Sequence, residues 1–275
     1  MIPAAFDYIR VASADEAIAA LAEHGDEAKL IAGGHSLIPL MRFRLATPRY
    51  LVDIGRLNDL THVRDAGEHL AIGALTRHRD IEVSDLVMSQ TGLLAEATRS
   101  VGDIQVRHRG TIGGAIAHGD AASDIPAALL ALRATVVAKG PNGEREIAID
   151  DFFSGFLETA LDETELLTEI RVPKVPDATW SFQKFNRRAQ DWAIVGASIL
   201  LDGDRAGVGL VNMDSVPIRA NAVEAALAGG ADAAAAADVA AEGADVPSDL
   251  NASSEYREHL ARVLVRRGLE AAGRV

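Results

Sequence analysis

The chain has 275 residues, 48% apolar and 24% charged, which is an ordinary composition for a globular protein of two or three modest domains. It carries 27 Lys and Arg against 40 Asp and Glu, a formal net charge of −13, so its surface repels nucleic acid and anionic membranes. The absence of cysteine excludes disulfides and Cys-ligated zinc or iron–sulfur clusters within the chain. The eight His show no metal-ligand spacing, so we predict no metal site and no nucleic-acid partner.

No part of the sequence predicts insertion into a membrane or export. No apolar run reaches the roughly 18 residues that a membrane-spanning helix needs. The N-terminal stretch "MIPAAFDYIRVAS" has no basic region followed by a long apolar segment, as a secretory signal would have. We therefore expect a cytoplasmic protein without a transmembrane segment.

The chain begins with a small α/β unit. Residues 13–25 predict a helix, in which Ser13 and Glu16 form a capping-box pattern. "KLIA" (29–32) and "YLVDI" (50–54) predict short buried strands. Between these strands lie two adjacent glycines and a short helix.

The middle of the chain predicts a larger α/β unit. "HLAIGALT" (69–76) and "ATVVAKG" (134–140) have strand character, and residues 93–101 have helical spacing of their apolar side chains. The segment "VRHRGTIGGAIAHGDAASDIPAALLAL" (106–132) contains a second glycine pair, then a polar loop, and then a helix that begins near Asp124.

The last third of the chain predicts strands first and helices after, which is typical of an α+β domain. Three strands are expected at "FQKFN" (182–186), "AIVGASILLD" (193–202) and "RAGVGLVNM" (205–213), with a tight "DGDR" turn between the last two. Helices are expected at "NAVEAALAG" (221–229) and "SEYREHLARVLVRRGLEAA" (254–272). The Ala-rich stretch between them predicts a loosely packed helix and a loop.

The two glycine pairs, in "AGGHS" (32–36) and "TIGG" (111–114), predict a site for an anionic group. Each loop is expected to follow a buried strand and to open into a helix. Such a loop presents unpaired N–H groups and the positive end of the helix dipole, and glycine lets a bulky anion approach the backbone. For either loop alone, a simple tight turn is the favoured interpretation. Neither loop matches a Rossmann or P-loop motif. Two such loops from separate subdomains are expected to clamp one diphosphate group without Lys or Arg.

Five segments carry a family resemblance in their order and spacing: "AGGHSLIPLMRFRLATPRYLVDI", "VGDIQVRHRGTIGGAIAHGDAASDIPAALLAL", "FFSGFLETALDETELLTEIRVP", "KFNRRAQDWAIVGAS" and "VPIRANAVEAAL". Together they resemble the FAD-binding medium subunit of the molybdenum hydroxylases, especially the aerobic carbon monoxide dehydrogenase type. The resemblance runs through nearly the whole chain.

The resemblance implies an α+β fold of three parts, with FAD extended between them. Two α/β subdomains of the vanillyl-alcohol-oxidase-like (PCMH) FAD-binding type are expected over residues 1–57 and 58–176. A C-terminal α+β domain with a three-stranded sheet and helices is expected over residues 177–275.

The resemblance also implies which residues bind FAD. The first diphosphate loop and its flanks are Leu30, Ile31, Ala32, Gly33, Gly34, His35, Ser36 and Leu37. The second loop contributes Thr111, Gly113, Gly114 and Ala115. The remaining expected contacts are His118, Asp124, Leu166, Leu167, Lys184, Asp191 and Trp192.

Several of these residues have a second interpretation from the sequence alone. Asp124 is expected to cap its helix as well as to bind the ribityl region of the flavin. Lys184 either lies near the flavin ring, where its charge would stabilise the anionic reduced form, or is an exposed strand residue. Trp192 either shields the ring or fills the core between domains. We interpret His35 and His118 as contacts and predict no catalytic residue in this chain.

The resemblance implies a division of labour among subunits, because a chain without cysteine cannot hold the iron–sulfur clusters that the family uses. A large molybdopterin subunit oxidises the substrate and a small subunit carries electrons through two [2Fe–2S] clusters. The FAD of this chain then passes them to an external acceptor, which is quinone, NAD or oxygen. The expected assembly is a dimer of heterotrimers, which can lie peripherally at the inner face of the membrane. The alternatives are a self-sufficient FAD-dependent oxidase or reductase of the same fold, and a non-redox nucleotide-binding module.

Overall fold

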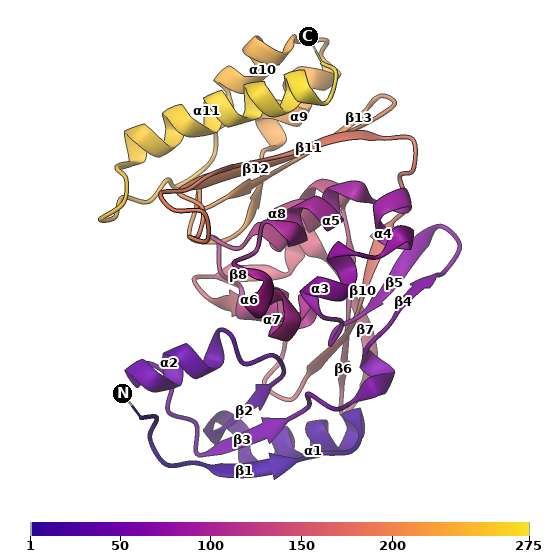
Figure 1. The fold of residues 1–275 in the computed structure, drawn as a ribbon, viewed down its shortest axis with the longest axis vertical. Helices are drawn as coiled ribbons and strands as arrows, with labels where there is room; N and C mark the ends of the chain where they lie inside the picture. Colours follow the sequence, from indigo (N-terminus) through magenta and orange to yellow (C-terminus); the bar gives the residue numbers. More distant parts are fainter. Residues whose placement is uncertain (1, 275) are drawn as a thin grey trace.

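The computed structural model describes residues 2–274, and its parts follow one another along the long axis of the molecule (Figure 1). A small sheet with the first helices lies at one end and a larger antiparallel sheet with six helices lies in the middle. A third sheet, covered by the C-terminal helices, lies at the other end.

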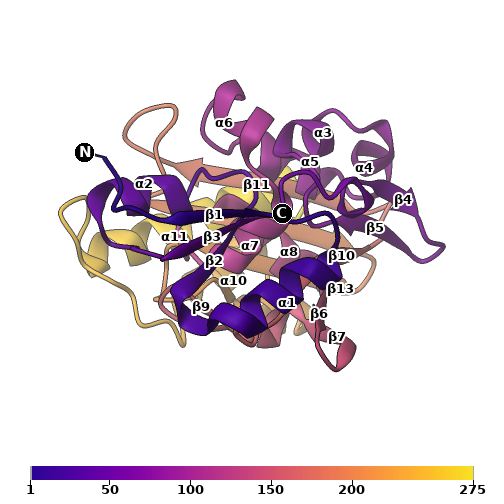
Figure 2. The same cartoon turned by 90° about the horizontal axis from the view of Figure 1, so that it is seen from below.

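The N-terminal unit is a parallel sheet with strand order β1-β3-β2. Its strands are β1 (Asp7–Arg10), β2 (Ala28–Ile31) and β3 (Tyr50–Asp53). Helix α1 (Ala14–His24) precedes β2, and α2 (Leu37–Phe43) follows it; Figure 2 shows them on opposite sides of the three strands. The predicted helix and both predicted strands are confirmed, whereas β1 was not predicted.

Local sequence explains where α1 begins and ends. The Ser13 hydroxyl accepts a hydrogen bond from the backbone N–H of Glu16, as the capping-box pattern predicts. Gly25, at φ 54, occupies the left-handed region and donates its N–H to the carbonyl of Leu21. The buried face of the helix, which includes Ile18 and Leu21, packs against the sheet.

The middle unit contains an antiparallel sheet with strand order β4-β5-β10-β6-β7. Its strands are β4 (Val63–Asp65), β5 (His69–Gly73), β6 (Thr135–Gly140), β7 (Gly143–Ala148) and β10 (Leu166–Pro173). The helices are α3 (His78–Glu82), α4 (Asp85–Gln90), α5 (Gly92–Arg99), α6 (Ile104–Arg109), α7 (Ile112–His118) and α8 (Asp124–Leu132). A small hairpin of β8 (Phe153–Gly155) and β9 (Glu158–Thr159) lies between β7 and β10.

Two sequence predictions about this unit are wrong in detail. The second glycine pair follows helix α6 and not a strand, and it lies in the first turn of α7. The N-cap residue of α8 is Ser123, so Asp124 is the first helical residue and does not cap the helix. The stretch that forms α7, IGGAIAH, is only seven residues long and contains two glycines, so it shows no clear helical period, which is why α7 was not predicted.

The C-terminal unit is an antiparallel sheet with strand order β11-β12-β13-β14. Its strands are β11 (Thr179–Phe185), β12 (Val195–Asp202), β13 (Arg205–Val211) and β14 (Ile218–Arg219). One face is covered by α9 (Asn221–Ala228), α10 (Ala233–Asp238) and α11 (Ser254–Ala271). The predicted sheet of three strands gains a fourth, because the two-residue β14 is too short to show a strand pattern.

Helix α8 belongs to the middle unit by sequence but packs on the other face of the C-terminal sheet (Figure 1). Its backbone lies directly on β13, where a Cβ added to Gly207 or Gly209 would overlap the carbonyl oxygens of Ala131 and Ala127. Every residue of α8 is buried. The lack of a side chain at these two glycines therefore allows α8 of the middle unit to pack closely on the C-terminal sheet.

Between residues 2 and 274, no helix combines the length and the low charge that crossing a membrane requires. Over the same range, His, Asp and Glu form no group of three or more that could hold a metal ion.

Candidate functional site

The two glycine loops meet, although they come from different units of the fold. A Cβ added to Gly33 would overlap the carbonyl oxygen of Arg109 and would lie 3.0 Å from the Cα of Gly110. Only glycine permits this approach of one backbone to the other. The first loop therefore lies directly against the residues that lead into the second loop.

The first loop offers free backbone donors. Gly34 has φ 77, a left-handed conformation that favours glycine, and its carbonyl accepts a hydrogen bond from Ile38 at 3.0 Å in the turn that opens α2. Within residues 2–274, the N–H groups of residues 33–37 donate to no protein acceptor. These consecutive donors can satisfy the oxygens of an anionic ligand.

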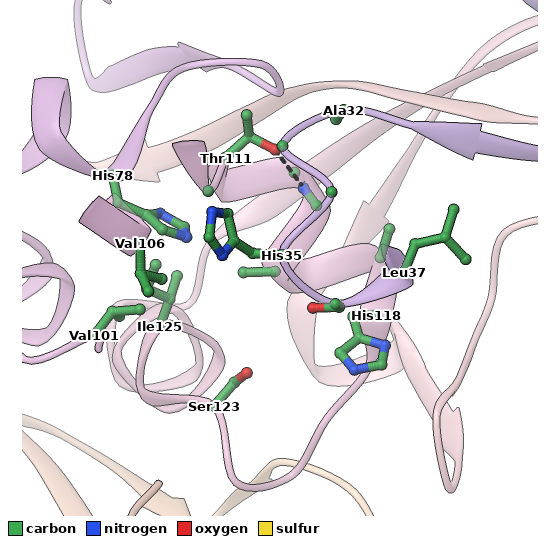
Figure 3. Close-up of a pocket in the computed structure, with 18 of the residues that line it drawn as sticks. Ala32, His35, Leu37, His78, Val101, Val106, Thr111, His118, Ser123 and Ile125 are labelled. Carbon is green, nitrogen blue, oxygen red and sulfur yellow. Dashed lines mark hydrogen bonds between the residues drawn. The ribbon is translucent and has the colours of Figure 1, made fainter. Parts of the chain in front are cut away.

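In the second loop, by contrast, the backbone N–H groups already donate to acceptors of the protein. The N–H of Ile112 donates to the Thr76 carbonyl at 3.1 Å, and that of Gly113 donates to the Ala74 carbonyl at 2.8 Å. The N–H of Gly114 donates to the Thr111 hydroxyl at 3.2 Å, the dashed line in Figure 3. The expectation that both loops present free amides therefore holds for the first loop alone. The second loop contributes an N-terminal turn whose Gly114 has no side chain.

One cavity of about 570 Å³ runs from the first loop to the C-terminal sheet. All of the residues that the sequence predicted as FAD contacts line it: 30–37, Thr111, Gly113, Gly114, Ala115, His118, Asp124, Leu166, Leu167, Lys184, Asp191 and Trp192. The cavity is also lined by residues that were not predicted, among them His78, Val101, Val106, Gly110 and Leu157. No signal in the sequence marks these, because apolar residues and a lone His occur at many positions that have nothing to do with a site.

A buried ion pair forms part of the cavity wall. Lys184 Nζ lies 2.7 Å from Asp124 Oδ2 and donates a second hydrogen bond to the Ser100 carbonyl at 3.0 Å. The interpretation of Lys184 as an exposed strand residue is therefore wrong. Burial raises the pKa of Asp124 to about 6, although the charge of Lys184 opposes this rise. The other oxygen of the carboxylate, Oδ1, is buried without a partner in the described structure.

Trp192 lies at the edge of the cavity with 67% of its surface exposed, so the interpretation that it fills the core between domains is wrong. Its neighbour Asp191 accepts a hydrogen bond from the guanidinium of Arg188 at 2.9 Å. Leu166 and Leu167 are buried at the start of β10, as predicted, and contribute an apolar wall to the cavity.

Two His rings face each other at one side of the cavity. Figure 3 shows the ring of His78 directed toward that of His35, with Leu37 and His118 on the opposite side. His35 is exposed, whereas His78 is buried. Burial, helped by the neighbouring side chains of His35, Arg107 and Arg77, lowers the pKa of His78 to about 4. The ring of His78 is therefore neutral at physiological pH.

Comparison with known protein families identifies this cavity. Residues 4–175 match the family model described as the FAD binding domain in molybdopterin dehydrogenase, and residues 180–272 match that of the CO dehydrogenase flavoprotein C-terminal domain. The chain belongs to the FAD subunits of the molybdenum hydroxylases. FAD is the cofactor of this family's first domain, and the cavity lies largely within that domain.

Members of this family resemble the chain over its full length. It is 39% identical to the carbon monoxide dehydrogenase medium chain of Hydrogenophaga pseudoflava, over 99% of this chain and 98% of that one. It is 38% identical to subunit alpha of the 6-hydroxypseudooxynicotine dehydrogenase complex of Paenarthrobacter nicotinovorans, over 99% and 96%. A solved structure of carbon monoxide dehydrogenase from Hydrogenophaga pseudoflava, in a form that lacks the Mo-pyranopterin moiety, matches with a TM-score of 0.95 and 41% identity, over 99% and 98%.

The residues of the cavity fit FAD. The free N–H groups of the first loop suit diphosphate oxygens, and the bare Gly114 leaves room beside them. The unpartnered Oδ1 of Asp124 is an acceptor for a hydroxyl donor such as those of the ribityl chain. The buried leucines of β10 present an apolar surface suited to an aromatic ring system.

Proposed function

We propose that the chain is the electron-transfer subunit of its complex, in which bound FAD receives electrons from [2Fe–2S] clusters of a partner subunit and passes them to quinone, NAD or oxygen. The observation that supports this proposal best is the single cavity that connects the free donors of the first glycine loop to the buried Lys184. Family membership supplies the cofactor, and the cavity supplies a place for its whole length.

The protein's own residues bind and orient the cofactor in this proposal. The N–H groups of residues 33–37, with the Thr111 hydroxyl nearby, hold the diphosphate. The carboxylate of Asp124 accepts a hydrogen bond from a hydroxyl group of the ribityl chain. Lys184 holds a positive charge near the flavin ring, and this charge favours electron uptake because it stabilises the added negative charge.

The proposed partners are a small subunit with two [2Fe–2S] clusters and a large molybdopterin subunit, assembled as a dimer of heterotrimers in the cytoplasm. The names of the relatives support a multi-subunit complex, since one is a medium chain and the other a subunit alpha. The lack of cysteine supports it as well, because the iron–sulfur clusters must then lie in another chain.

The carbon monoxide dehydrogenase type is the proposed branch, on the strength of the 39% relative and the matching solved structure. A relative named for an alkaloid derivative is nearly as similar, at 38%. This near equality is expected if the substrate is bound by a different subunit, since the FAD subunit then has no contact that distinguishes one substrate from another.

The function is tested with the full chain alone and in its native complex. The purified chain, supplied with FAD and freed of excess, should show flavin absorbance and should bleach with a chemical reductant. It should not bleach with carbon monoxide, aldehydes or N-heterocycles. Bleaching by one of these substrates would contradict the proposal and favour a self-sufficient oxidase. Affinity purification of the tagged chain from its own cells should bring down iron–sulfur and molybdenum subunits, and a chain recovered alone would count against the complex.

A further inference from the structure

His78 forms part of the cavity wall where the two glycine loops meet. It is the first residue of α3, and its N–H donates to the Gly110 carbonyl at 3.0 Å. Its ring packs on the bare Cα of Gly110, where an added Cβ would lie 2.5 Å from Cδ2 and 2.8 Å from Nε2. Gly110 is also the residue against which Gly33 of the first loop packs. The ring is therefore fixed at the junction that positions both loops.

The two ring nitrogens of His78 lie in different surroundings. Nδ1 is buried and has no hydrogen-bond partner in the described structure, whereas Nε2 lies beside Gly110, on a ring that lines the cavity. A neutral imidazole carries one proton, on one nitrogen or the other. A buried N–H without an acceptor is rarer in proteins than a bare acceptor. The proton therefore belongs on Nε2.

The charges around His78 keep this tautomer neutral. The groups that lower its pKa besides burial are His35, whose ring faces it in Figure 3, Arg107 from α6 and Arg77 beside it in the chain. All three oppose a second proton on the ring, as does burial, which leaves 4% of the residue exposed. The cavity wall thus holds an uncharged N–H donor whose direction is fixed.

We infer that His78 positions FAD by donating a hydrogen bond from Nε2 to an oxygen of its ribityl–diphosphate part. The inference rests on the FAD-binding function and adds a side-chain donor to the backbone donors of the first loop. Its place beside Gly110, on which Gly33 packs, puts the ring at the junction of the two loops. An uncharged donor at that place fixes the position of the cofactor in the cavity without changing the charge around the flavin ring.

Two substitutions separate the roles of the ring nitrogens. His78→Gln places an amide N–H near the position of Nε2, whereas His78→Asn places one near Nδ1. We expect H78N to weaken FAD binding about tenfold, the equivalent of one hydrogen bond to a charged or strongly polar group, and H78Q to stay within about threefold of the wild type. The dissociation constant is measured by the quenching of flavin fluorescence. The control is His259→Gln, on the exposed face of α11, which should bind like the wild type.

Further readouts distinguish positioning from a structural role. The flavin midpoint potential of H78N should equal that of the wild type, and its melting temperature without FAD should match that of H78Q. In the 15N-labelled wild-type chain, long-range 1H–15N spectra should show the Nε2–H tautomer of His78, with an Nε2 shift that changes when FAD is added. Equal affinities for H78N and H78Q, an Nδ1–H tautomer, or a spectrum that FAD leaves unchanged would overturn the inference. A wild-type chain that takes up no FAD would instead overturn the function itself.

Discussion

Lys184 Nζ lies 2.7 Å from Asp124 Oδ2, so a strand of the C-terminal sheet and the first residue of α8 are joined by a buried charge pair at the wall of the FAD cavity. Because one partner comes from each matched family domain, the pair spans the boundary between them. If these two residues contact FAD as proposed, the pair connects the binding of the cofactor with the docking of the two domains.

Lys184→Met should destabilise the protein and lower the flavin midpoint potential. Removing one member of a buried pair leaves the other unpaired, and we expect a loss of about 3 kcal/mol in the free energy of unfolding. The potential should fall because a positive charge near the ring is lost. The control is Lys139→Met: Lys139 also lies 2.7 Å from a carboxylate, that of Asp15, but this pair is more exposed, so its loss should change the free energy of unfolding much less. Equal losses in the two variants, measured by urea unfolding, would contradict this account.

The raised pKa of Asp124 predicts how stability changes with pH. Burial raises this pKa from an ordinary 3.8 to about 6, so between these values the folded protein keeps a proton that the unfolded chain releases. The free energy of unfolding should therefore fall as pH rises through this range, by up to about 3 kcal/mol from this group. Asp124→Asn lacks the effect, and the difference between wild type and D124N, measured by denaturant unfolding without FAD, should decrease from pH 4 to pH 7. A constant difference would show that Asp124 is ionised throughout.

Two glycines of the loops should respond differently to alanine. Gly33→Ala brings a Cβ into the Arg109 backbone, and we expect a loss of about 2 kcal/mol in stability together with loss of FAD binding. The Cβ of Gly114→Ala meets only the Thr111 hydroxyl, at 2.8 Å. This variant should impair FAD binding, but its loss of stability should stay below about 1 kcal/mol. Gly229→Ala, at an ordinary φ of −75, is the control. Thermal melts and FAD titration check the ranking, and an unimpaired G33A chain would show that the loops do not need to touch.

Trp192→Ala should leave stability nearly unchanged, because two-thirds of the side chain is exposed already. If the indole shields the flavin, the variant should expose bound FAD to solvent, with stronger iodide quenching of flavin fluorescence and faster reoxidation by oxygen. Trp192→Tyr is the matched control and should behave like the wild type. A large drop in melting temperature with unchanged quenching would assign the side chain a structural role instead.

Among substitutions outside the cavity, replacement of Arg257 should cause the largest loss of stability. Its side chain is 1% exposed, lies 2.8 Å from Asp249 Oδ2 and donates to the carbonyls of Ile194 and Asn212. Arg257→Met should cost about 3–5 kcal/mol, because it leaves these acceptors unpaired. Arg266→Met is the control: this exposed residue on the same helix pairs with Glu270 at 2.8 Å, and its replacement should leave the free energy of unfolding nearly unchanged. Similar costs in a urea titration would contradict the role of burial.

The sequence predicted the elements whose pattern is local. Helix α1 has its cap residues and its apolar face in one stretch, and strands β12 and β13 are apolar runs joined by a recognisable turn. Short elements such as β1, β14 and α7 were not predicted because their few residues show no period. They form because neighbouring segments supply their hydrogen bonds.

The sequence predicted the site residues that are glycines or charged residues in a motif. It did not predict those that line the cavity only because of how the chain packs. Gly33 and Lys184 are of the first kind, and both line the cavity. His78 is of the second kind, since its burial depends on Gly110, which is 32 positions away in the sequence. The engagement of the second loop's amides was also missed, because two of their acceptors, the carbonyls of Ala74 and Thr76, belong to the turn after β5.

The close contact of α8 with β13 at Gly207 and Gly209 makes the flavin site a shared property of two domains that family comparison treats as separate. A fragment that stops before residue 179 would expose a helix whose every residue is built to be covered, and it would lack the cation that faces Asp124. We therefore expect such a fragment to bind FAD more weakly than the full chain, because the last third of the chain supplies part of the cavity wall.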